Sequence, residues 1–166
     1  VVPYGDTDPA WLWRSAFDEG EYGIGNSFSS LELGRDVPNH ATLLNAHFID
    51  SEGKVKVQEN KIALYERDGG SSWHHAHWGT TYSKRARELV LTTIATIGNY
   101  DYVYNWIFKQ NGEIECDVAA TGIMLPKGID AHEGHSGHAH KVDDYLSAPH
   151  HQHFFNFRID FDVDGT

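Results

Sequence analysis

Two histidines near the end of the chain have the spacing of a metal-binding pair. His151 and His153 begin a segment, residues 151–163, in which apolar side chains recur at every second position. On a β-strand, residues i and i+2 point to the same side, so two imidazoles can converge on one metal ion. Neutral imidazole is a ligand for copper, zinc, iron and nickel. The alternative is one satisfied core histidine and one solvated at the strand end, and the spacing alone leaves both interpretations open.

The other side of the same segment is acidic. Asp160 and Asp162, with the backbone carbonyl of Phe161 between them, could ligate a hard cation such as calcium. Residues 160–165 begin like an EF-hand loop, but the apolar residues at the intervening positions follow the period of a strand and argue against that motif. By itself, the acidic face is more typical of a solvated strand edge that resists strand addition.

Most of the other histidines fall into two clusters. Residues 130–140 hold His132, His135, His138 and His140 among glycine and serine, which indicates a flexible stretch that would hold metal only adventitiously. Residues 73–78 place three histidines between two tryptophans, and here we expect a packing role. Cys116, the single cysteine, lies in a strand pattern and is expected to be a small buried residue.

The elements that must position these residues are strands. The first forty residues are rich in glycine, proline, aspartate and tryptophan and indicate loops and turns. Asn111-Gly112 is a hairpin signal. A polar loop is predicted over residues 126–149, and a helical turn over residues 83–91. The predicted strands are residues 41–49, 55–57, 62–66, 88–97, 100–108, 114–124 and 151–163. Short strands separated by turns predict an all-β sandwich or barrel-like architecture.

Composition excludes several classes of protein. The 166 residues are about the length of one domain. The net charge of −11 argues against a nucleic-acid-binding protein, which needs a basic surface. No apolar run approaches the roughly 20 residues that a membrane-spanning helix needs. A single cysteine excludes an internal disulfide.

Four motifs, taken in order, resemble one enzyme family. They are residues 1–6 (Val-Val-Pro-Tyr-Gly-Asp), residues 17–23 (Phe-Asp-Glu-Gly-Glu-Tyr-Gly), the Asn-Tyr-Asp-Tyr run at residues 99–102, and the His-Gln-His pair followed by residues 158–165. Together they resemble the copper-containing primary amine oxidases, the topaquinone enzymes, and most of all the bacterial members. The resemblance covers essentially the whole chain.

The resemblance implies a role for each motif. Tyr100 would be the tyrosine that is oxidised to topaquinone, and Asp18 the base that removes a proton from the α-carbon of the amine. Tyr4 would hydrogen-bond a quinone oxygen, and Asn99 would restrain the ring. His151 and His153 would be two of the three copper(II) ligands. Asp160, Asp162 and the carbonyl of Phe161 would form part of a calcium site, which changes our interpretation of the acidic face.

The fold and activity implied are those of the family. We expect residues 1–166 to be a segment of one large antiparallel β-sandwich domain, truncated at both ends. Small amino-terminal domains, the carboxy-terminal part of the catalytic domain and the third copper ligand are expected outside this chain. The parent protein is expected to be a homodimer without membrane insertion, in a periplasmic or extracellular setting.

The expected reaction is oxidative deamination of a primary amine by dioxygen, giving an aldehyde, ammonia and hydrogen peroxide. Two alternatives remain open from the residues alone. One is a non-catalytic, histidine-rich metal-binding module, and the other is an inactive fragment that lacks the third copper ligand. The sequence does not identify the preferred amine.

Overall fold

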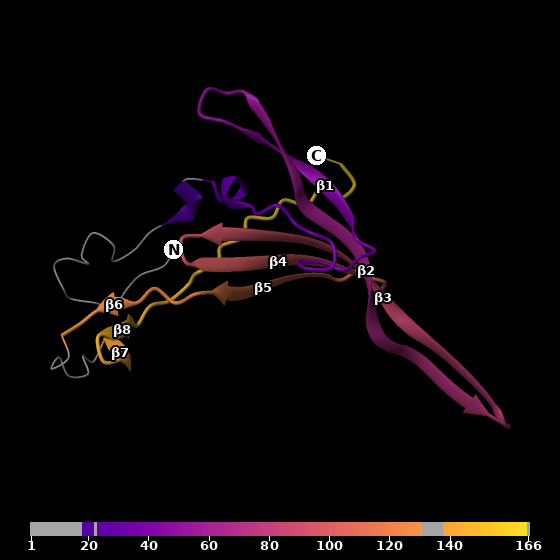
Figure 1. Cartoon of the computed structure of the whole chain (residues 1–166). Helices are drawn as coiled ribbons and strands as arrows, with labels where there is room; N and C mark the ends of the chain where they lie inside the picture. Colours follow the sequence, from indigo (N-terminus) through magenta and orange to yellow (C-terminus); the bar gives the residue numbers. More distant parts are fainter. Residues whose placement is uncertain (1–17, 22, 131–137, 166) are drawn as a thin grey trace. The chain divides into compact units, whose positions relative to one another are not determined.

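A computed structural model of the chain describes residues 18–21, 23–130 and 138–165 (Figure 1). The chain divides into two compact units, one of residues 23–123 and one of residues 1–22 with 124–166. Tyr4 and residues 131–137 of the histidine-rich stretch lie outside the described residues. No helix within the described residues is long and apolar enough to cross a membrane.

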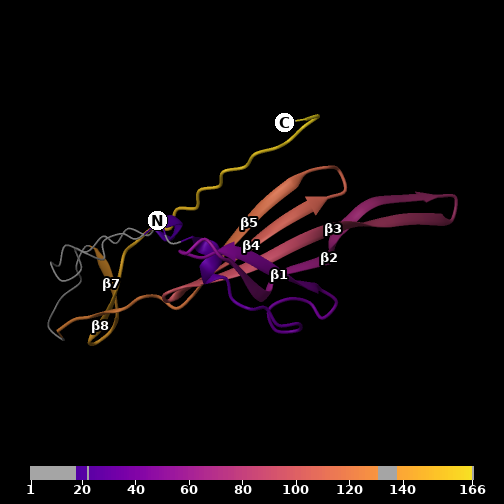
Figure 2. The same cartoon turned by 90° about the horizontal axis from the view of Figure 1, so that it is seen from above.

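The unit of residues 23–123 is built on a five-stranded antiparallel sheet (Figures 1 and 2). Its order is β1-β2-β3-β4-β5, so each strand pairs with its neighbour in the chain. The strands are β1 (Thr42–Ile49), β2 (Val55–His77), β3 (Thr80–Ile97), β4 (Tyr100–Lys109) and β5 (Ile114–Gly122). Antiparallel neighbours need only short turns, which is why glycine-containing turns punctuate this part of the chain. The all-β prediction is confirmed.

The sheet is buried where β3 and β4 pair. Val90 faces Ile107 across these strands, and both side chains are almost completely buried. Burial of such a side chain stabilises the fold by about 1.5–3 kcal/mol. A second cluster joins the loop before β1 to β2, and it consists of Leu31, Val37, Ala41 and Ala63. Before β1, the described residues otherwise form turns and two short 3-10 helices, η2 (Glu19–Glu21) and η3 (Ile24–Ser27), so the expected loops are confirmed for this part of the chain.

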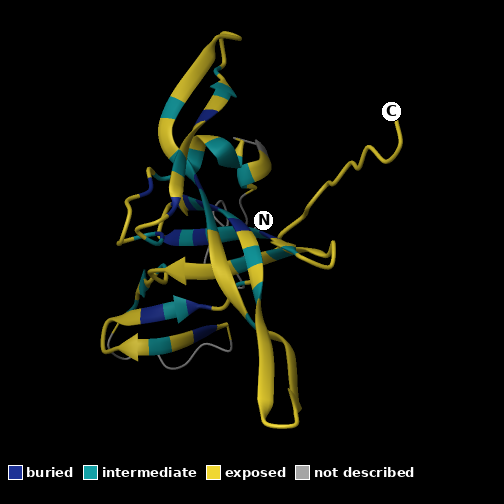
Figure 3. Cartoon of the chain, turned by 90° about the vertical axis from the view of Figure 1, so that its right-hand side faces the viewer, coloured by how far each residue is buried: buried dark blue, intermediate teal, exposed yellow. Residues whose placement is uncertain are grey.

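Strands β2 and β3 continue beyond the rest of the sheet as a two-stranded hairpin. Pairing of β3 with β4 begins only at Glu88, so residues 68–87 pair with one another alone. We call residues 68–87 the arm, and its tip is exposed (Figure 3). The strands predicted at residues 55–57 and 62–66 are confirmed, as parts of one longer strand, β2. The helical turn predicted over residues 83–91 is wrong, because these residues form part of β3, where the cross-strand ladder outweighs local preference.

The arm also corrects the expectation for residues 73–78. We predicted a packing role, but Trp73 is 47% exposed and Trp78 is 93% exposed. Cys116, expected to be buried, is half-buried on β5. The hairpin at Asn111-Gly112 is confirmed, since the backbone N–H of Lys109 donates to the carbonyl of Glu113 at 2.9 Å and Gly112 has a φ of 85°.

The second unit contains a small three-stranded sheet. It is formed by β6 (Lys127–Gly128), β7 (Ala139–Asp143) and β8 (Leu146–Pro149), in the order β6-β8-β7. The prediction of a polar loop over residues 126–149 was therefore wrong. Ala139 and Pro149 face each other in the ladder of β7 and β8, and both are buried. Small side chains carried too little of an alternating pattern to reveal these short strands.

The predicted final strand over residues 151–163 is also wrong for the described chain. His151 makes an isolated bridge, and residues 152–165 are assigned to no strand. The apolar side chains of this segment are largely exposed, with Phe161 at 63% and Val163 at 75%. A strand is defined by its ladder, and no ladder to another strand runs along this segment within the described residues.

Candidate active site

Tyr100 lies at the first position of β4, directly after a tight turn. It pairs with Ile97, so Gly98 and Asn99 form a two-residue hairpin loop between β3 and β4. Gly98 has a φ of 60°, and glycine is favoured where the first loop residue of such a turn needs a positive φ. Tyr100 is only 6% exposed, and its ring centroid lies 6.4 Å from that of Tyr102. The turn therefore presents a buried phenol at the end of the sheet.

Two polar contacts hold this turn from the β3 side. The hydroxyl of Thr96 donates to Oδ1 of Asp101 at 2.6 Å. The contact joins β3 to β4 one residue pair before the loop. The hydroxyl oxygens of Ser29 and Thr96 lie 2.8 Å apart and share a hydrogen bond. A hydrogen bond to a charged carboxylate is among the stronger contacts a side chain can make.

Strand β5 holds the turn from the other side. The backbone N–H of Ile123 donates to the carbonyl of Asn99 at 2.7 Å. Gly122 has a φ of 100°, and a β-carbon at this position would lie 2.5 Å from the same carbonyl oxygen. Only glycine fits such a close approach of two backbones. Asn99 is thus anchored through its backbone, while the residue as a whole is exposed.

The neighbour of Tyr100 on the same face has a perturbed ionisation. The pKa of Tyr102 is raised to about 12, first because burial disfavours the phenolate and then because Tyr100 and Tyr104 add negative charge when ionised. Tyr102 is 3% exposed. The residue therefore remains a neutral phenol at physiological pH.

His151 and His153 lie together in the other unit. Their ring centroids are 4.8 Å apart, with an angle of 53° between the rings. Nδ1 of His151 is 2.9 Å from the carbonyl oxygen of Pro149. A carbonyl can only accept, so Nδ1 carries the proton and Nε2 keeps a lone pair for a metal. Burial, and then the charge of His151, lower the pKa of His153 and favour the neutral form that binds metal.

These two imidazoles fit part of a copper site. Copper is well suited to imidazole nitrogen, and a carbonyl that orients the first ring is a common supporting feature of metal-binding histidines. Within residues 18–21, 23–130 and 138–165 there is no group of three or more His, Cys, Asp or Glu residues that could hold a metal ion. Asp160, Phe161 and Asp162, predicted to bind calcium, are all exposed.

Asp18 lies just before η2 and is exposed. Its Oδ1 accepts a hydrogen bond from the backbone N–H of Gly20 at 2.9 Å, as in an Asx turn. Asp18 and the two histidines belong to one unit, whereas Tyr100 and Asn99 belong to the other. The structure thus brings together Tyr100 with its turn, and His151 with His153.

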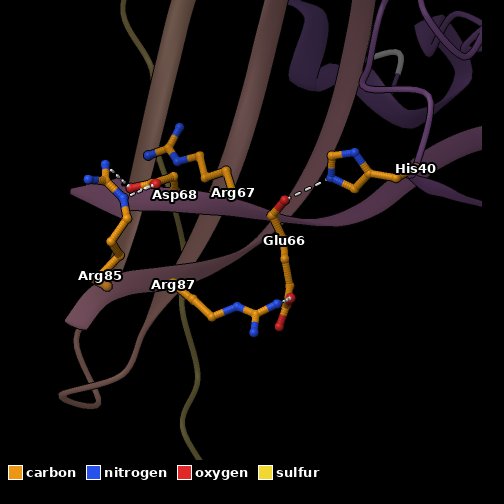
Figure 4. A pocket seen from close by; sticks show the side chains of 7 residues that line it. His40, Glu66, Arg67, Asp68, Arg85 and Arg87 are labelled. Atoms are coloured by element: carbon orange, nitrogen blue, oxygen red, sulfur yellow. Dashed lines mark hydrogen bonds and ion pairs between the residues drawn. The ribbon is translucent and has the colours of Figure 1, made fainter. Parts of the chain in front are cut away.

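A separate hollow of about 510 Å³ lies at the base of the arm (Figure 4). Arg85 is paired with Asp68 and Arg87 with Glu66, and Nε2 of His40 lies 2.9 Å from the carbonyl oxygen of Glu66. The third arginine of the lining, Arg67, is paired with Glu88, so each arginine around the hollow has an acidic partner. It contains none of the predicted site residues.

Sequence reasoning did not identify the residues that support Tyr100 and His151. Ser29 is 67 positions from its partner Thr96, and no local pattern could link the two. Gly122, at the end of a predicted strand, carried a weak signal, because an interior or terminal strand glycine often marks a close backbone approach. Pro149 lies inside the segment that we predicted to be a loop.

Known proteins resemble the chain over its full length. The family model described as copper amine oxidase, enzyme domain, matches residues 1–166. The chain is 39% identical to a primary amine oxidase of Klebsiella aerogenes over 99% of its length, and 42% identical to a primary amine oxidase of Arthrobacter sp. (strain P1) over 100%. These alignments cover 23% and 26% of the two relatives, so the chain spans about a quarter of their length.

A solved structure agrees with these matches. The crystal structure of a copper-containing benzylamine oxidase from Hansenula polymorpha superimposes with a TM-score of 0.77 at 34% identity, and the match covers 90% of this chain and 24% of that one. The antiparallel sheet, the buried tyrosine at its turn and the full-length family match lead to one conclusion. The chain belongs to the copper amine oxidase family, whose enzyme-domain model matches it from residue 1 to residue 166.

Proposed function

We propose that the protein containing this chain oxidises primary amines with dioxygen. The overall reaction takes one amine, one dioxygen and one water, and yields an aldehyde, ammonia and hydrogen peroxide. Family membership supports amine oxidation by a copper enzyme. The observation that carries the assignment of roles is the position of Tyr100, a buried phenol on a turn that is anchored from both neighbouring strands.

In this proposal, Tyr100 is the residue that becomes topaquinone. That group supplies an electrophilic carbonyl and an electron sink, so the hard chemistry belongs to the cofactor. The protein contributes orientation. The Thr96–Asp101 contact and the hydrogen bond to the Asn99 carbonyl both restrain the turn, and they therefore hold the backbone from which the ring of Tyr100 projects.

His151 and His153 are the proposed copper(II) ligands in this chain. Their close rings, and the carbonyl of Pro149 that fixes the proton of His151 on Nδ1, support this role. The third ligand is proposed to come from the protein outside this segment. Asp160, Asp162 and the carbonyl of Phe161 are proposed to contribute to a calcium site.

Asp18 is the proposed general base, and Tyr4 and Asn99 are proposed to hold the ring derived from Tyr100. The exposed carboxylate of Asp18 can accept a proton from a bound amine, and its contact with the N–H of Gly20 limits its orientations. The parent protein is proposed to act as a homodimer, and residues 1–166 as one segment of its catalytic domain. Sedimentation of the full-length protein tests the dimer.

Peptide mass analysis of the full-length protein tests the assignment of Tyr100. After aerobic incubation with copper, the peptide that contains Tyr100 should gain two oxygen atoms and lose two hydrogens. The Tyr100→Phe variant should lose this change and all peroxide production. Tyr104→Phe, which alters another tyrosine on the same face of β4, is the matched control and should keep both. An unmodified Tyr100 in active protein would refute the proposal.

A further inference from the structure

We propose that residues 28–31 form a strap that positions the turn of Tyr100, with Ser29 and Lys61 as its positioning residues. The inference rests on the proposed function, because it gives these residues a part in preparing Tyr100 for its oxidation. The strap lies between η3 and β1. It begins ten residues after the proposed base, Asp18, and so lies on the chain between that base and the sheet.

Strand β2 leaves β3 before the turn of Tyr100 is reached. Within the described chain, the ladder of these two strands ends at the pair of Ala63 and Thr92. Strand β3 continues to Ile97 and pairs along one edge with β4, as far as Tyr100. Residues 93–97 of β3 therefore need a different partner on their second edge, since backbone donors and acceptors at the end of a sheet must be satisfied.

A bulge in β2 lies where the two strands part. Residues 59–61 of β2 lie opposite the single residue Asn45 of β1. Asn60 has a φ of 55°, a left-handed conformation that asparagine tolerates better than most residues, and its N–H donates to Oδ1 of Asn45 at 3.2 Å. Bulges bend a strand and are common beside active sites. This one turns β2 away from the end of β3.

The strap takes the second edge of β3. Phe28 forms an antiparallel bridge with Ala95, and the backbone N–H of Ser29 donates to the carbonyl of Ile94 at 2.8 Å. Because β4 occupies one edge of β3, the strap occupies the edge that β2 has left.

This position brings the strap to the turn through side chains. The hydroxyl oxygen of Ser29 lies 2.8 Å from that of Thr96. Thr96 donates in turn to Asp101, the residue after Tyr100. Ser29 is thus one side chain removed from the turn, and it acts on Tyr100 through Thr96.

The bulge holds the strap from its other side. The ammonium of Lys61 donates to the carbonyl of Phe28 at 2.6 Å, and the backbone N–H of Leu31 donates to the carbonyl of Asn60 at 2.7 Å. Lys61 is half-buried, and a hydrogen bond from a charged donor is stronger than one between neutral groups. The ring of Phe28 packs edge-on against Phe48 of β1, with 6.1 Å between the ring centroids. The strap is therefore fixed to β1, β2 and β3 together.

Amide hydrogen exchange in the full-length protein measures whether the strap controls the turn. In Ser29→Ala, the amide hydrogens of residues 97–101 should exchange about fivefold to tenfold faster, because one hydrogen bond that restrains the turn is lost. Lys61→Met should act in the same direction, since it releases the strap from the bulge. Ser29→Thr keeps the hydroxyl and should retain the slow exchange.

Ser30→Ala is the matched control, because the hydroxyl of Ser30 donates to the carbonyl of Glu59 on β2, at 3.1 Å. It should leave exchange at residues 97–101 unchanged, as should Lys56→Met at an exposed lysine of the same strand. Equal acceleration in Ser29→Ala and Ser30→Ala would overturn the proposal, and so would unchanged exchange in Ser29→Ala. Circular dichroism should confirm that each variant is folded.

Turnover distinguishes this inference from the proposed function. Ser29→Ala should modify Tyr100 more slowly and lower kcat by about tenfold or more with KM almost unchanged, since a loosened turn misplaces the reacting ring. Faster exchange with a normal kcat would make the strap a structural support only and would overturn its positioning role. A Tyr100 that stays unmodified in the active, unaltered protein would instead refute the proposed function, whatever the exchange rates.

Discussion

The hydroxyl of Thr96 donates a 2.6 Å hydrogen bond to Oδ1 of Asp101, across the turn that carries Asn99 and Tyr100. Thr96 and Asp101 face each other in the ladder of β3 and β4, one pair before the turn. The contact therefore closes the end of the hairpin from which Tyr100 projects.

Thr96→Val should loosen the turn with little change in side-chain shape. It removes the hydrogen bond to Asp101 and the one shared with Ser29, and we expect unfolding free energy to fall by about 1 kcal/mol. Denaturant titration measures the loss, and the rate of modification of Tyr100 should fall with it. Thr81→Val, on the exposed arm, should leave both unchanged. Equal effects of the two substitutions would show that the hydrogen bonds of Thr96 do not hold the turn.

Gly122→Ala should disturb the same turn through a backbone clash. The new β-carbon would meet the carbonyl oxygen of Asn99 at 2.5 Å and the amide nitrogen of Asp101 at 2.7 Å. Gly112→Ala is the control, because Gly112 also has a positive φ, 85°, but has open space around its α-carbon. Each substitution costs about 1–2 kcal/mol for the backbone conformation. The clash should add about 1–3 kcal/mol for Gly122 alone. Thermal unfolding measures the difference in stability between the two variants. Equal losses of stability would contradict the predicted clash at Gly122.

Stability should depend on Tyr102 in alkaline solution. Its pKa is raised from 10.0 to about 12 by burial and by the neighbouring tyrosines, so the folded state favours the neutral phenol. The unfolded chain loses this proton near pH 10. The stabilisation is therefore complete below pH 10 and is lost as the pH rises toward 12. Tyr102→Phe should flatten this part of the stability curve, whereas Tyr82→Phe, at a half-exposed tyrosine, should not. If stability falls equally steeply with pH in both variants, the alkaline loss of stability does not come from Tyr102.

Asp18→Asn tests the role of Asp18 as a base separately from its hydrogen bond to the N–H of Gly20. The amide oxygen of asparagine can still accept from the N–H of Gly20, so the turn should persist while the basic carboxylate is lost. We expect peroxide production by the full-length protein to fall by about 10²–10⁴-fold. Peptide mass analysis should find the modification of Tyr100 unchanged. Glu19→Gln, at the next residue, should retain activity, and near-normal turnover by Asp18→Asn would exclude Asp18 as the base.

Local patterns predicted the part of the fold that depends on neighbouring residues. The strand predicted over residues 100–108 and the Asn111-Gly112 turn both depend on residues close together in the chain, and both are confirmed. The spacing of His151 and His153 likewise placed two rings close together, as observed. The roles assigned to Tyr4, Asp18, Tyr100 and the two histidines rest on the resemblance and stay predictions.

The failures concern partners that a local pattern cannot specify. Residues 151–163 alternate as regularly as residues 100–108, yet only the latter lie in a strand. Alternation states which side chains share a face, but a strand also needs a second strand for its backbone groups. The arm shows the converse, because residues 83–91 became a strand through pairing with β2 despite a weak helical pattern.

The sequence by itself determined the antiparallel all-β class, the exclusion of an internal disulfide, and the family, because each follows from composition, short-range periodicity or ordered motifs. Tertiary structure alone decided how Tyr100 is held, since Ser29, Thr96 and Gly122 reach its turn from separate segments. It also decided that His75 and His77 stand on an exposed arm and not in a core. The physical reason is that burial and hydrogen bonding between distant segments depend on the closed sheet, which no local run of residues contains.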